Sequence, residues 1–408
     1  MVSISGLYDI AFTFYFATIM AHCTGSGLDH TLSLASFAFV MCVFLVDIVR
    51  SHKLVFDFFN KSMLTFLIIV FSSTLWAVYP GYVFSRDYSN ILMEGPQMLM
   101  ISLALSQRIK CKEDVVRYFR IYLIAIAYLL VSIIVKTPPS HYLSGVRIGT
   151  VTGLWVNALA KLYCIGLGLI YYFLSKAESY KKIPLLIMAA LLILFTLLTG
   201  SKNGILMIVS ITFLAYFLHG SFTGKVRIIV STLILGSILL YLMFNVPALY
   251  NIIGYRMETF FDIFTSGNGF AADSSTSTRS DLMAFAWTMF LERPFLGWGF
   301  ANVAGYVAAQ GYFIVTYAHS NYLELLADVG LIGTLVFYAP HLSAFGKFSK
   351  RIILYRNKDM LNCTVYAILI VILLTDYASV NITTVYYWTI IQLIYYLARY
   401  TEYEECGR

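Results

Sequence analysis

Long apolar runs recur along almost the whole chain, and they constrain its fold more than any other feature. A helix needs about 17 to 25 mostly apolar residues to cross the hydrocarbon core of a membrane. The chain of 408 residues is 60% hydrophobic and 12% charged, whereas soluble domains are closer to half apolar and a quarter charged. The alternating pattern of an outer-membrane β-barrel is absent. We therefore predict an all-α, polytopic membrane protein.

The apolar runs predict about twelve spans, which form a single transmembrane domain over residues 1–408. The spans lie near residues 7–22, 30–49, 57–77, 89–106, 119–135, 154–174, 184–199, 204–219, 227–244, 321–340, 361–376 and 382–398. One long connector, residues 245–320, separates the ninth span from the tenth.

The basic residues are divided unequally between the two sides of the predicted membrane domain. Most of the 28 lysines and arginines fall in alternate connectors, at residues 50–61, 108–120, 176–182, 225–227, 347–358 and 399–408. The positive-inside rule places these connectors and both termini in the cytoplasm and the 245–320 loop outside. The outer side then holds Arg86, Lys136, Arg147, Lys202, Arg256, Arg279 and Arg293. The net charge of +7 thus reflects topology, so no nucleic acid partner is expected.

The external loop contains a predicted amphipathic helix over residues 279–292, with Thr278 as its N-cap. Residues 266–278 before it are rich in Gly, Ser and Thr and are typical of a linker. The turn Pro-Phe-Leu-Gly-Trp-Gly follows it. We expect this helix to lie on the membrane surface. Arg279 at its start either binds a ligand or extends to the lipid headgroups.

His319 stands directly before the tenth span, within which Asn321, Glu324 and Asp328 share one helix face. Carboxylates on a membrane helix avoid lipid, so we expect this face to line a wet cavity that opens outward. His319 at the mouth of the cavity is either a general base, since imidazole titrates near neutral pH, or a residue that caps the helix.

Two Gly/Ser-rich segments add cations on the outer side. SGVRIGTVTG (144–153) contains Arg147, and LLTGSKNGIL (197–206) contains Lys202 at its tip. Each is either an ordinary turn or an anion site made of backbone N–H groups and a cation. Together with Arg279 and His319, these cations suit a diphosphate better than a neutral solute.

The sequence predicts neither a metal site nor a cofactor. The six cysteines are scattered without a CxxC pair, and the external carboxylates form no DxD pair. No Walker loop or dinucleotide fingerprint is present, so ATP-driven transport is not expected.

At these residues the chain resembles the O-antigen ligase/polymerase family of bacterial envelope glycan assembly. The matching pieces are TRSDLMAFAWTMFLERPFLGWGF (278–300) and YAHSNYLELLADVGLIG (317–333), in which Gly330 follows His319 at the family's spacing. Weaker matches are LLTGSKNGIL and GVRIGTVTGLWVNALA. Lys202 stands where many relatives carry arginine, so a point cation replaces a bidentate phosphate ligand there.

The resemblance implies a GT-C-like fold and a metal-independent glycosyltransferase in the bacterial cytoplasmic (inner) membrane, with its active site at the outer face. Its donor would be an oligosaccharide on undecaprenyl diphosphate, and an acceptor hydroxyl would attack the anomeric carbon with inversion. Arg147 and Arg279 would neutralise the diphosphate, and Lys202 would assist them. His319 would activate the acceptor or contact the diphosphate. The residues that contact the donor or acceptor would be held in position by Asn321, Glu324 and Asp328.

Three functions stay open at this point. The first is a Wzy-type polymerase that joins lipid-linked repeat units of a capsule, an exopolysaccharide or an O-antigen. The residues of the SKNG, RSDL and HSNYLELL motifs favour this polymerase. The second is a ligase that transfers the finished glycan to lipid A core or to a protein. The third is a flippase or exporter of the lipid-linked glycan, which cations gathered at one face disfavour. Expected partners are the lipid-linked donor, an acceptor glycan, membrane lipids, and a chain-length regulator and flippase of the same pathway.

Overall fold

The computed structural model describes residues 3–21, 28–79, 86–142, 146–149, 155–220, 222–255, 257–258, 274–356 and 359–400. Every regular element in these ranges is a helix. Within the same ranges, nine helices are long and apolar enough to cross a membrane. The prediction of an all-α, polytopic membrane protein is therefore confirmed.

The first group of helices is α1 (Ile4–Ala21), α2 (Leu28–Ser51), α3 (Phe58–Ser73), α5 (Arg86–Arg108), α6 (Lys112–Lys136) and the short 3-10 helix η1 (Pro139–Tyr142). Helix α1 packs against both α2 and α6. Helix α3 begins at a capping box, in which the Asp57 carboxylate accepts the Asn60 N–H and the Asn60 side chain accepts the Asp57 N–H, both at 3.2 Å.

The middle group is α7 (Val156–Lys176), α8 (Ser179–Leu198), α9 (Lys202–His219), α10 (Phe222–Asn245), α11 (Pro247–Leu249) and the π-helix η2 (Tyr250–Gly254). Helix α7 packs against α8 and α9, and α10 packs against the outer side of α9. Many side chains of α10 are exposed and apolar, which suits a helix that faces lipid.

The last group is α14 (Ser274–Glu292), α15 (Val303–Ala309), α16 (Asn321–Ser349), the π-helix η3 (Lys350–Leu354), α17 (Met360–Thr375), the 3-10 helix η4 (Asp376–Ala378) and α18 (Val385–Arg399). Helix α14 begins at Ser274 rather than at residue 279. Thr278 therefore lies inside the helix, and its prediction as the N-cap is wrong. Residues 259–273, which include most of the predicted linker, lie outside the described residues.

Each predicted span overlaps a helix, but three of these helices do not meet the length and hydropathy of a full span. Helices α3 and α18 have only 16 and 15 residues. Helix α5 carries the polar residues Glu94 and Gln97. The predicted third span ends too late, because residues after Thr74 leave the helix to bond elsewhere: the Val78 N–H donates to the carbonyl of Trp298 at 3.2 Å.

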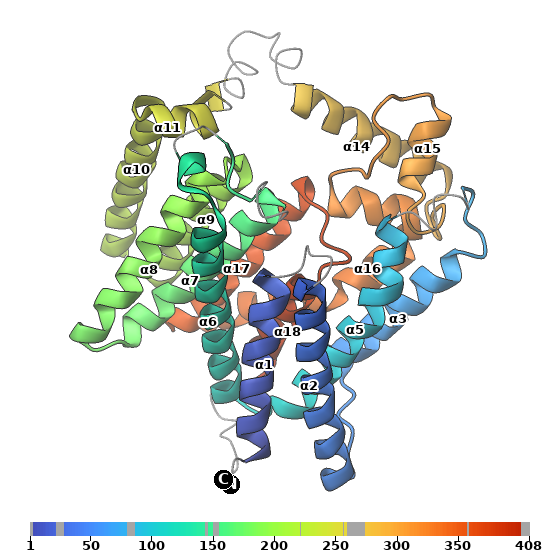
Figure 1. Cartoon of the computed structure of the whole chain (residues 1–408), viewed down its shortest axis with the longest axis horizontal. Helices are drawn as coiled ribbons and strands as arrows, with labels where there is room; N and C mark the ends of the chain where they lie inside the picture. The colour runs from blue at the N-terminus through green and yellow to red at the C-terminus, as the bar shows by residue number, and fades with distance from the viewer. Residues whose placement is uncertain are drawn as a thin grey trace.

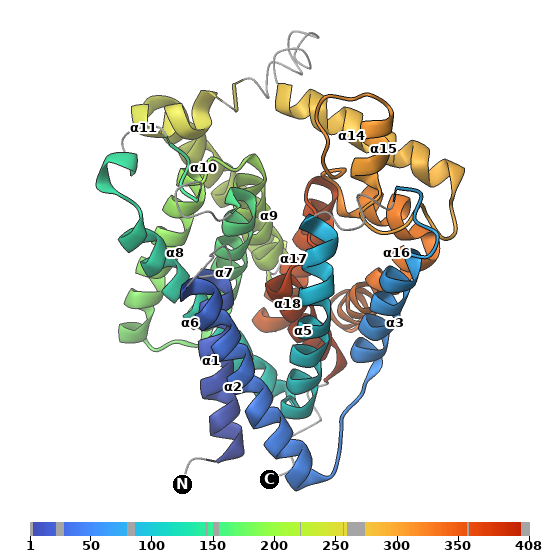
Figure 2. The same cartoon turned by 45° about the vertical axis from the view of Figure 1, so that its right-hand side comes forward.

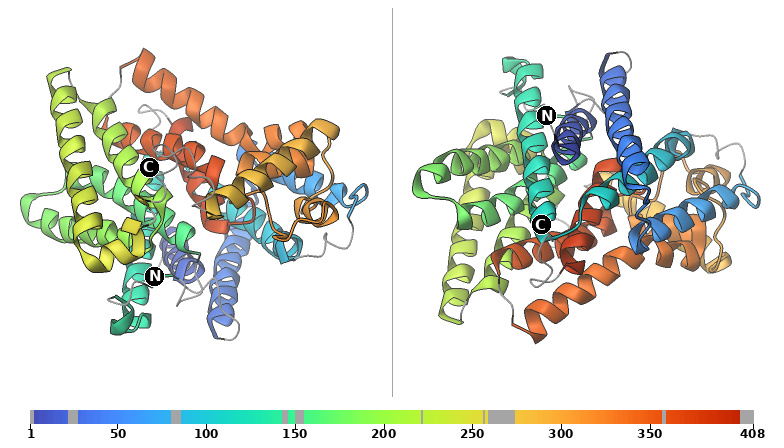
Figure 3. Two further views of the ribbon diagram at one scale, coloured as in Figure 1. Left: turned by 90° about the horizontal axis from the view of Figure 1, so that it is seen from above. Right: turned by 90° about the horizontal axis from the view of Figure 1, so that it is seen from below.

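The helices form a bundle with two distinct ends. Figures 1 and 2 show α11, α14 and α15 at one end and the marked chain ends at the opposite end. The end-on views in Figure 3 place α10 and α14 on opposite sides of the molecule. We call the end that carries α14 and α15 the loop end, and the opposite end the terminal end.

Ion pairs at the terminal end join connectors that are far apart in sequence. Arg108 lies 3.6 Å from Asp9, Lys112 lies 3.5 Å from Asp359, and Arg399 lies 3.4 Å from Asp57. These pairs join the end of α5 to α1, the start of α6 to the connector before α17, and the end of α18 to the start of α3. Basic residues of two connectors that the sequence assigns to one side of the membrane are thus engaged in these pairs.

Candidate functional site

A polar cavity of about 390 Å³ lies between α7, the first turns of α16, and the segment that joins η4 to α18. Its lining includes His319, Glu324 and Asp328 from the sequence-predicted residues, and Asn157 and Lys161 from α7. The prediction that the polar face of the tenth span lines a cavity therefore holds for Glu324 and Asp328. Arg147, Lys202, Arg279 and Asn321 are not part of the lining.

A break in α16 shapes the wall of this cavity. Gly330 has a φ of 64°, and a Cβ at this position would collide with the carbonyl oxygen of Phe295. The turn at residues 294–299 inserts at the break: the N–H groups of Leu331 and Ile332 donate to the carbonyls of Pro294 and Phe295 at 2.8 and 3.3 Å. The break thus satisfies backbone groups that a helix end leaves unpaired. It also explains why a glycine follows His319 at this spacing.

Both carboxylates of α16 hold the loops beside the cavity. Asp328 accepts the backbone N–H groups of Ala301 at 2.8 Å and Asn302 at 3.1 Å. Glu324 accepts the backbone N–H of Ala318 at 2.5 Å. Both side chains are buried, and hydrogen bonds from backbone N–H groups satisfy them there. Each carboxylate therefore positions a loop that carries cavity-lining residues.

Asn321 stabilises the structure around the site. Its side chain accepts the Asn381 N–H at 2.9 Å and donates to the Tyr338 hydroxyl at 2.8 Å, and it is completely buried. These bonds tie the start of α16 to the segment between η4 and α18, two residues after His319.

His319 lies within reach of the charge of Arg279. His319 is partly buried, and its φ of 58° is unusual for a residue other than glycine. Its ring lies 4.3 Å from the ring of Tyr317. Burial first, and then the charge of Arg279, lower the pKa of His319 to about 4. His319 is therefore a neutral imidazole near pH 7.

The packing of α14 accounts for the position of Arg279. Leu282, Ala286 and Met289 are fully buried in a small apolar cluster that also contains Trp298 and Ala327. The Trp298 indole N–H donates to the carbonyl of Met289 at 2.8 Å. The apolar cluster and this hydrogen bond fix the rotation of α14 about its axis. The predicted apolar face thus packs against protein, whereas Trp287 and Leu291 on the other side are exposed.

Arg147 meets the turn that carries Lys202. The Arg147 Nε–H donates to the carbonyl of Thr199 at 2.8 Å, and Gly200 has a φ of 62° with its Cα facing that guanidinium. Lys202 is the first residue of α9, after the N-cap Ser201. Ser201 in turn donates to the side chain of Asn157 at 2.8 Å, and Asn157 lines the cavity. One hydrogen bond therefore connects this turn to the cavity wall.

Some residues of the predicted turn sequences cannot be placed. Residues 143–145 and 150–154 of the segment around Arg147 lie outside the described residues. Within the part of the chain that is described, no group of three or more His, Cys, Asp or Glu side chains is arranged to hold a metal ion.

Lys161 and Asp376 were not predicted from the sequence as site residues. Lys161 lies in α7 and lines the cavity, with its Nζ 3.1 Å from the Ser379 Oγ and 3.6 Å from Asp376. The available signal was a lysine inside a predicted span, because such charges are rare and face polar interiors. Asp376 stands at the predicted end of the eleventh span and looked like an ordinary boundary residue.

Residues 187–338 match the family model described as O-antigen ligase. The matched segment runs from α8 to α16 and contains all the predicted site residues except Arg147. No curated protein matches the chain. The resemblance carried by the motifs is thus confirmed over this segment, and the protein is a polytopic helical membrane protein that is similar there to the O-antigen ligase family.

Proposed function

We propose that the protein is a glycosyltransferase that joins oligosaccharide repeat units carried on undecaprenyl diphosphate. The observation that carries the proposal is a neutral His319 in the lining of a cavity, within reach of the charge of Arg279 and inside the segment that matches the O-antigen ligase family. Such a pair combines a cation for a leaving phosphate with a group that can accept a proton.

In the proposed step, an acceptor hydroxyl oxygen attacks the anomeric carbon of the donor sugar. The bond between that carbon and the diphosphate oxygen breaks, and the diphosphate leaves with the electron pair. The hydroxyl proton passes to His319. Attack opposite the leaving group inverts the anomeric centre.

Arginine is suited to the leaving group because its planar guanidinium grips phosphate oxygens in pairs. The charge of Arg279 reaches His319, and Arg147 and Lys202 form a second cationic group at the turn before α9. We propose that the diphosphate binds between these two groups. There it would meet fixed positive charge as its own negative charge develops.

Donor binding would also make His319 a better base. A pKa of about 4 leaves the free imidazole neutral but weakly basic. Part of that lowering comes from Arg279, and a bound diphosphate would offset the charge of this guanidinium. The pKa of His319 would therefore rise once the donor is in place, nearer to the range where general bases act efficiently.

A ligase is the second candidate, because the matching family model is described as O-antigen ligase. It would use the same donor and the same residues, and it would differ only in the acceptor, which would be lipid A core or a protein. A flippase or exporter is a weaker candidate. The cations discussed above gather at the loop end, whereas a transport path would need them along its length.

In this proposal the loop end faces the periplasm or exterior, and both termini lie in the cytoplasm. The basic residues that form ion pairs at the terminal end support this orientation through the positive-inside rule. The undecaprenyl chain would stay in the membrane, and a flippase and a chain-length regulator would act before and beside the enzyme.

The test is to incubate purified protein with an undecaprenyl-diphosphate-linked repeat unit, without nucleotide or added metal, and to separate the products by size. A ladder of repeats supports the polymerase, and transfer only to added lipid A core supports the ligase. Movement of the donor across vesicles without any new glycosidic bond would overturn the enzyme proposal. The Arg279→Ala variant is the negative control.

A further inference from the structure

Lys161 is a charged residue inside the bundle that the proposed reaction does not yet use. It is only 4% exposed, and it lies within a membrane-spanning helix, where an ionised side chain is costly. Its Nζ donates to the Ser379 hydroxyl at 3.1 Å and lies 5.6 Å from the centre of the Tyr387 ring. The part of the side chain that is accessible borders the cavity.

The partner of Lys161 is already well provided with hydrogen bonds. Asp376 accepts from the hydroxyls of Tyr387 at 2.6 Å and Tyr338 at 3.1 Å, and from the Asn381 side chain at 2.8 Å. Lys161 is farther away, at 3.6 Å. Buried ion pairs often add no stability over apolar replacements. The pair as a whole therefore does not account for the stability of the bundle, whereas loss of the ammonium alone would leave the Asp376 charge uncompensated.

The rest of the cavity lining has the character of a carbohydrate site. Its neutral polar groups, its ordered carboxylates and its aromatic rings offer donors, acceptors and flat apolar faces together. The neutral polar residues are Asn157, Thr316, Ser379, Asn381, Thr383 and Thr384, and the aromatic residues are Trp155, Phe300, Tyr317 and Tyr386. Sugar rings present both hydroxyl groups and apolar C–H faces, which such a lining complements.

The cations suited to a diphosphate are separate from this lining. Arg147, Lys202 and Arg279 do not line the cavity, although His319 does. Lys161 is the cation among the lining residues, and the carboxylates of Glu324 and Asp328 beside it bind backbone N–H groups. A mixed lining of this kind favours a neutral polyhydroxyl ligand over a phosphate.

We propose that Lys161 is a specificity-determining residue that donates a hydrogen bond to a hydroxyl group of a sugar bound in this cavity. Asp376 is a positioning residue, which together with Ser379 holds the ammonium against the cavity wall. The inference rests on the proposed function, since it assigns the sugar to the cavity and the diphosphate to the outer cations.

The test measures binding of a free oligosaccharide repeat unit, cut from the surface polysaccharide of the source bacterium, to the full-length protein in detergent. This probe has no diphosphate, so the result does not depend on glycosyl transfer. Lys161→Met keeps the length of the side chain and removes its charge and its donors. The expected result is an affinity at least about tenfold weaker, the usual cost of losing a hydrogen bond to a charged group.

Two further variants keep the test decisive. Lys161→Met alone leaves the buried Asp376 charge without a cation and risks misfolding. The double variant Lys161→Met/Asp376→Asn removes both charges, and we expect it to fold and to bind the sugar as weakly as the single variant. Lys181→Met removes an exposed lysine that pairs with Glu178, and it should bind like the unmodified protein.

Unchanged sugar affinity in the folded double variant would overturn the role of Lys161. Absence of sugar binding by the unmodified protein would overturn the sugar site itself. The proposed function fails separately, if the unmodified protein binds the sugar but forms no glycosidic bond from the lipid-linked donor. Asp376→Asn alone keeps the ammonium, so as a positioning residue it should weaken sugar binding less than Lys161→Met does.

Discussion

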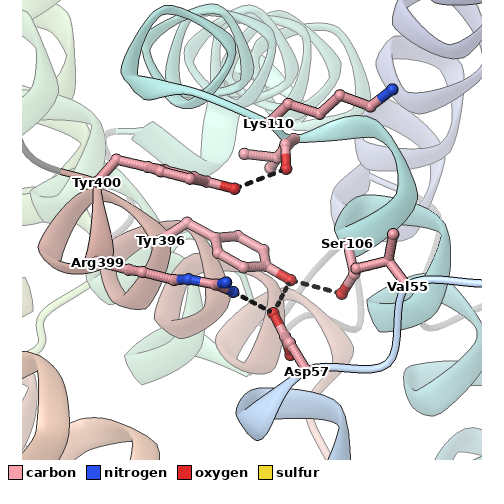
Figure 4. Close-up of a pocket in the computed structure, with 8 residues that line it drawn as sticks. Val55, Asp57, Ser106, Lys110, Tyr396, Arg399 and Tyr400 are labelled. Atoms are coloured by element: carbon pink, nitrogen blue, oxygen red, sulfur yellow. Dashed lines mark hydrogen bonds and ion pairs between the residues drawn. The ribbon is translucent and has the colours of Figure 1, made fainter. Parts of the chain in front are cut away.

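The loop end and the terminal end each contain a polar pocket, and the two pockets are nearly equal in volume. The cavity at the loop end has about 390 Å³, and the pocket at the terminal end has about 370 Å³. The terminal pocket is lined by Val55, Asp57, Ser106, Ile109, Lys110, Tyr396, Arg399 and Tyr400 (Figure 4). Volume therefore does not distinguish them, and the difference lies in what their polar groups bind.

In the terminal pocket the polar groups bind one another. The Tyr396 hydroxyl lies 2.7 Å from an Asp57 carboxylate oxygen and 2.5 Å from the Ser106 hydroxyl, and Arg399 lies 3.4 Å from the same carboxylate. Figure 4 shows Tyr396 and Arg399 directed at Asp57 and the Ser106 hydroxyl at that of Tyr396, while the ammonium of Lys110 points away from them. Because Asp57 also caps α3, this cluster joins the start of α3 to α5 and α18.

At the loop end His319 and Lys161 line the cavity. His319 has a positive φ and is within reach of the charge of Arg279. Strained backbone and paired titratable groups are concentrated at functional sites. The comparison supports the proposal that the chemistry takes place at the loop-end cavity, whereas the hydrogen bonds of the terminal pocket stabilise the fold.

Replacement of His319 should have the largest effect on the reaction. His319→Ala removes the proposed proton acceptor, so we expect the rate of glycosyl transfer to fall by about 10²- to 10⁴-fold. His219→Ala, which changes an exposed histidine in the last turn of α9, is the matched control. The rate of product formation at saturating donor measures the effect. A normal rate in His319→Ala would break the assignment of chemistry to the loop end.

Replacement of Arg279 should have the next largest effect. Arg279→Ala removes fixed positive charge from the leaving diphosphate, and losses of about 10²- to 10³-fold in kcat are typical for such groups. Arg293→Ala is the control, because Arg293 follows the same helix and stacks on Trp298, 4.7 Å from the ring centre. Equal losses in both variants would show that the fold of α14, and not the charge of Arg279, carries the effect.

The pH dependence should be weak over the range in which an ordinary histidine titrates. A proton acceptor must be neutral, so activity is present above the pKa of His319 and is lost as the pH falls through it. With that pKa at about 4, kcat/KM should fall less than twofold through this residue between pH 7 and pH 5. A loss of tenfold or more centred near pH 6.5 in kcat/KM would contradict the close approach of Arg279 and the burial of His319.

Replacement of Asp57 should have the smallest effect, and on stability alone. Asp57→Ala removes the cap of α3, so we expect a loss of about 1 kcal/mol in the free energy of unfolding. Thermal unfolding in detergent measures this loss, and the rate per folded molecule should not change. A large loss of rate with normal stability would make the terminal pocket a functional site and would reverse the comparison.

Local hydropathy patterns were sufficient to predict where the spanning helices lie. Apolar runs of membrane length predicted an overlapping helix at every span, because a chain in lipid must satisfy its backbone groups within each segment. The same patterns failed at the end of α3. There the chain leaves the helix to bond the turn at residues 296–302, as when the Tyr79 N–H donates to the Asn302 side chain at 2.7 Å. Such a partner more than 200 residues away is not visible in local hydropathy.

The candidate site was predictable where a polar residue interrupts an apolar pattern. His319, Glu324 and Asp328 were found in this way, and all three line the cavity. Lys161 stands inside a predicted span, where a charged residue is an exception. Its place in the site was not predictable, because its partners Asp376 and Ser379 follow more than 200 residues later. The role of Asp328 as a clamp for the loop at residues 301–302 likewise depends on contacts that sequence spacing does not reveal.

The sequence by itself determined the all-α membrane fold, the sorting of basic connectors to one end, and the residues that carry the family resemblance. Each follows from local hydropathy, charge or motif, which act along the chain. Only the tertiary structure decided that the charge of Arg279 acts on His319, that Gly330 breaks α16 around the inserted turn, and that Lys161 lines the cavity. These outcomes depend on how helices pack and rotate against one another, and packing joins residues that are far apart in the chain.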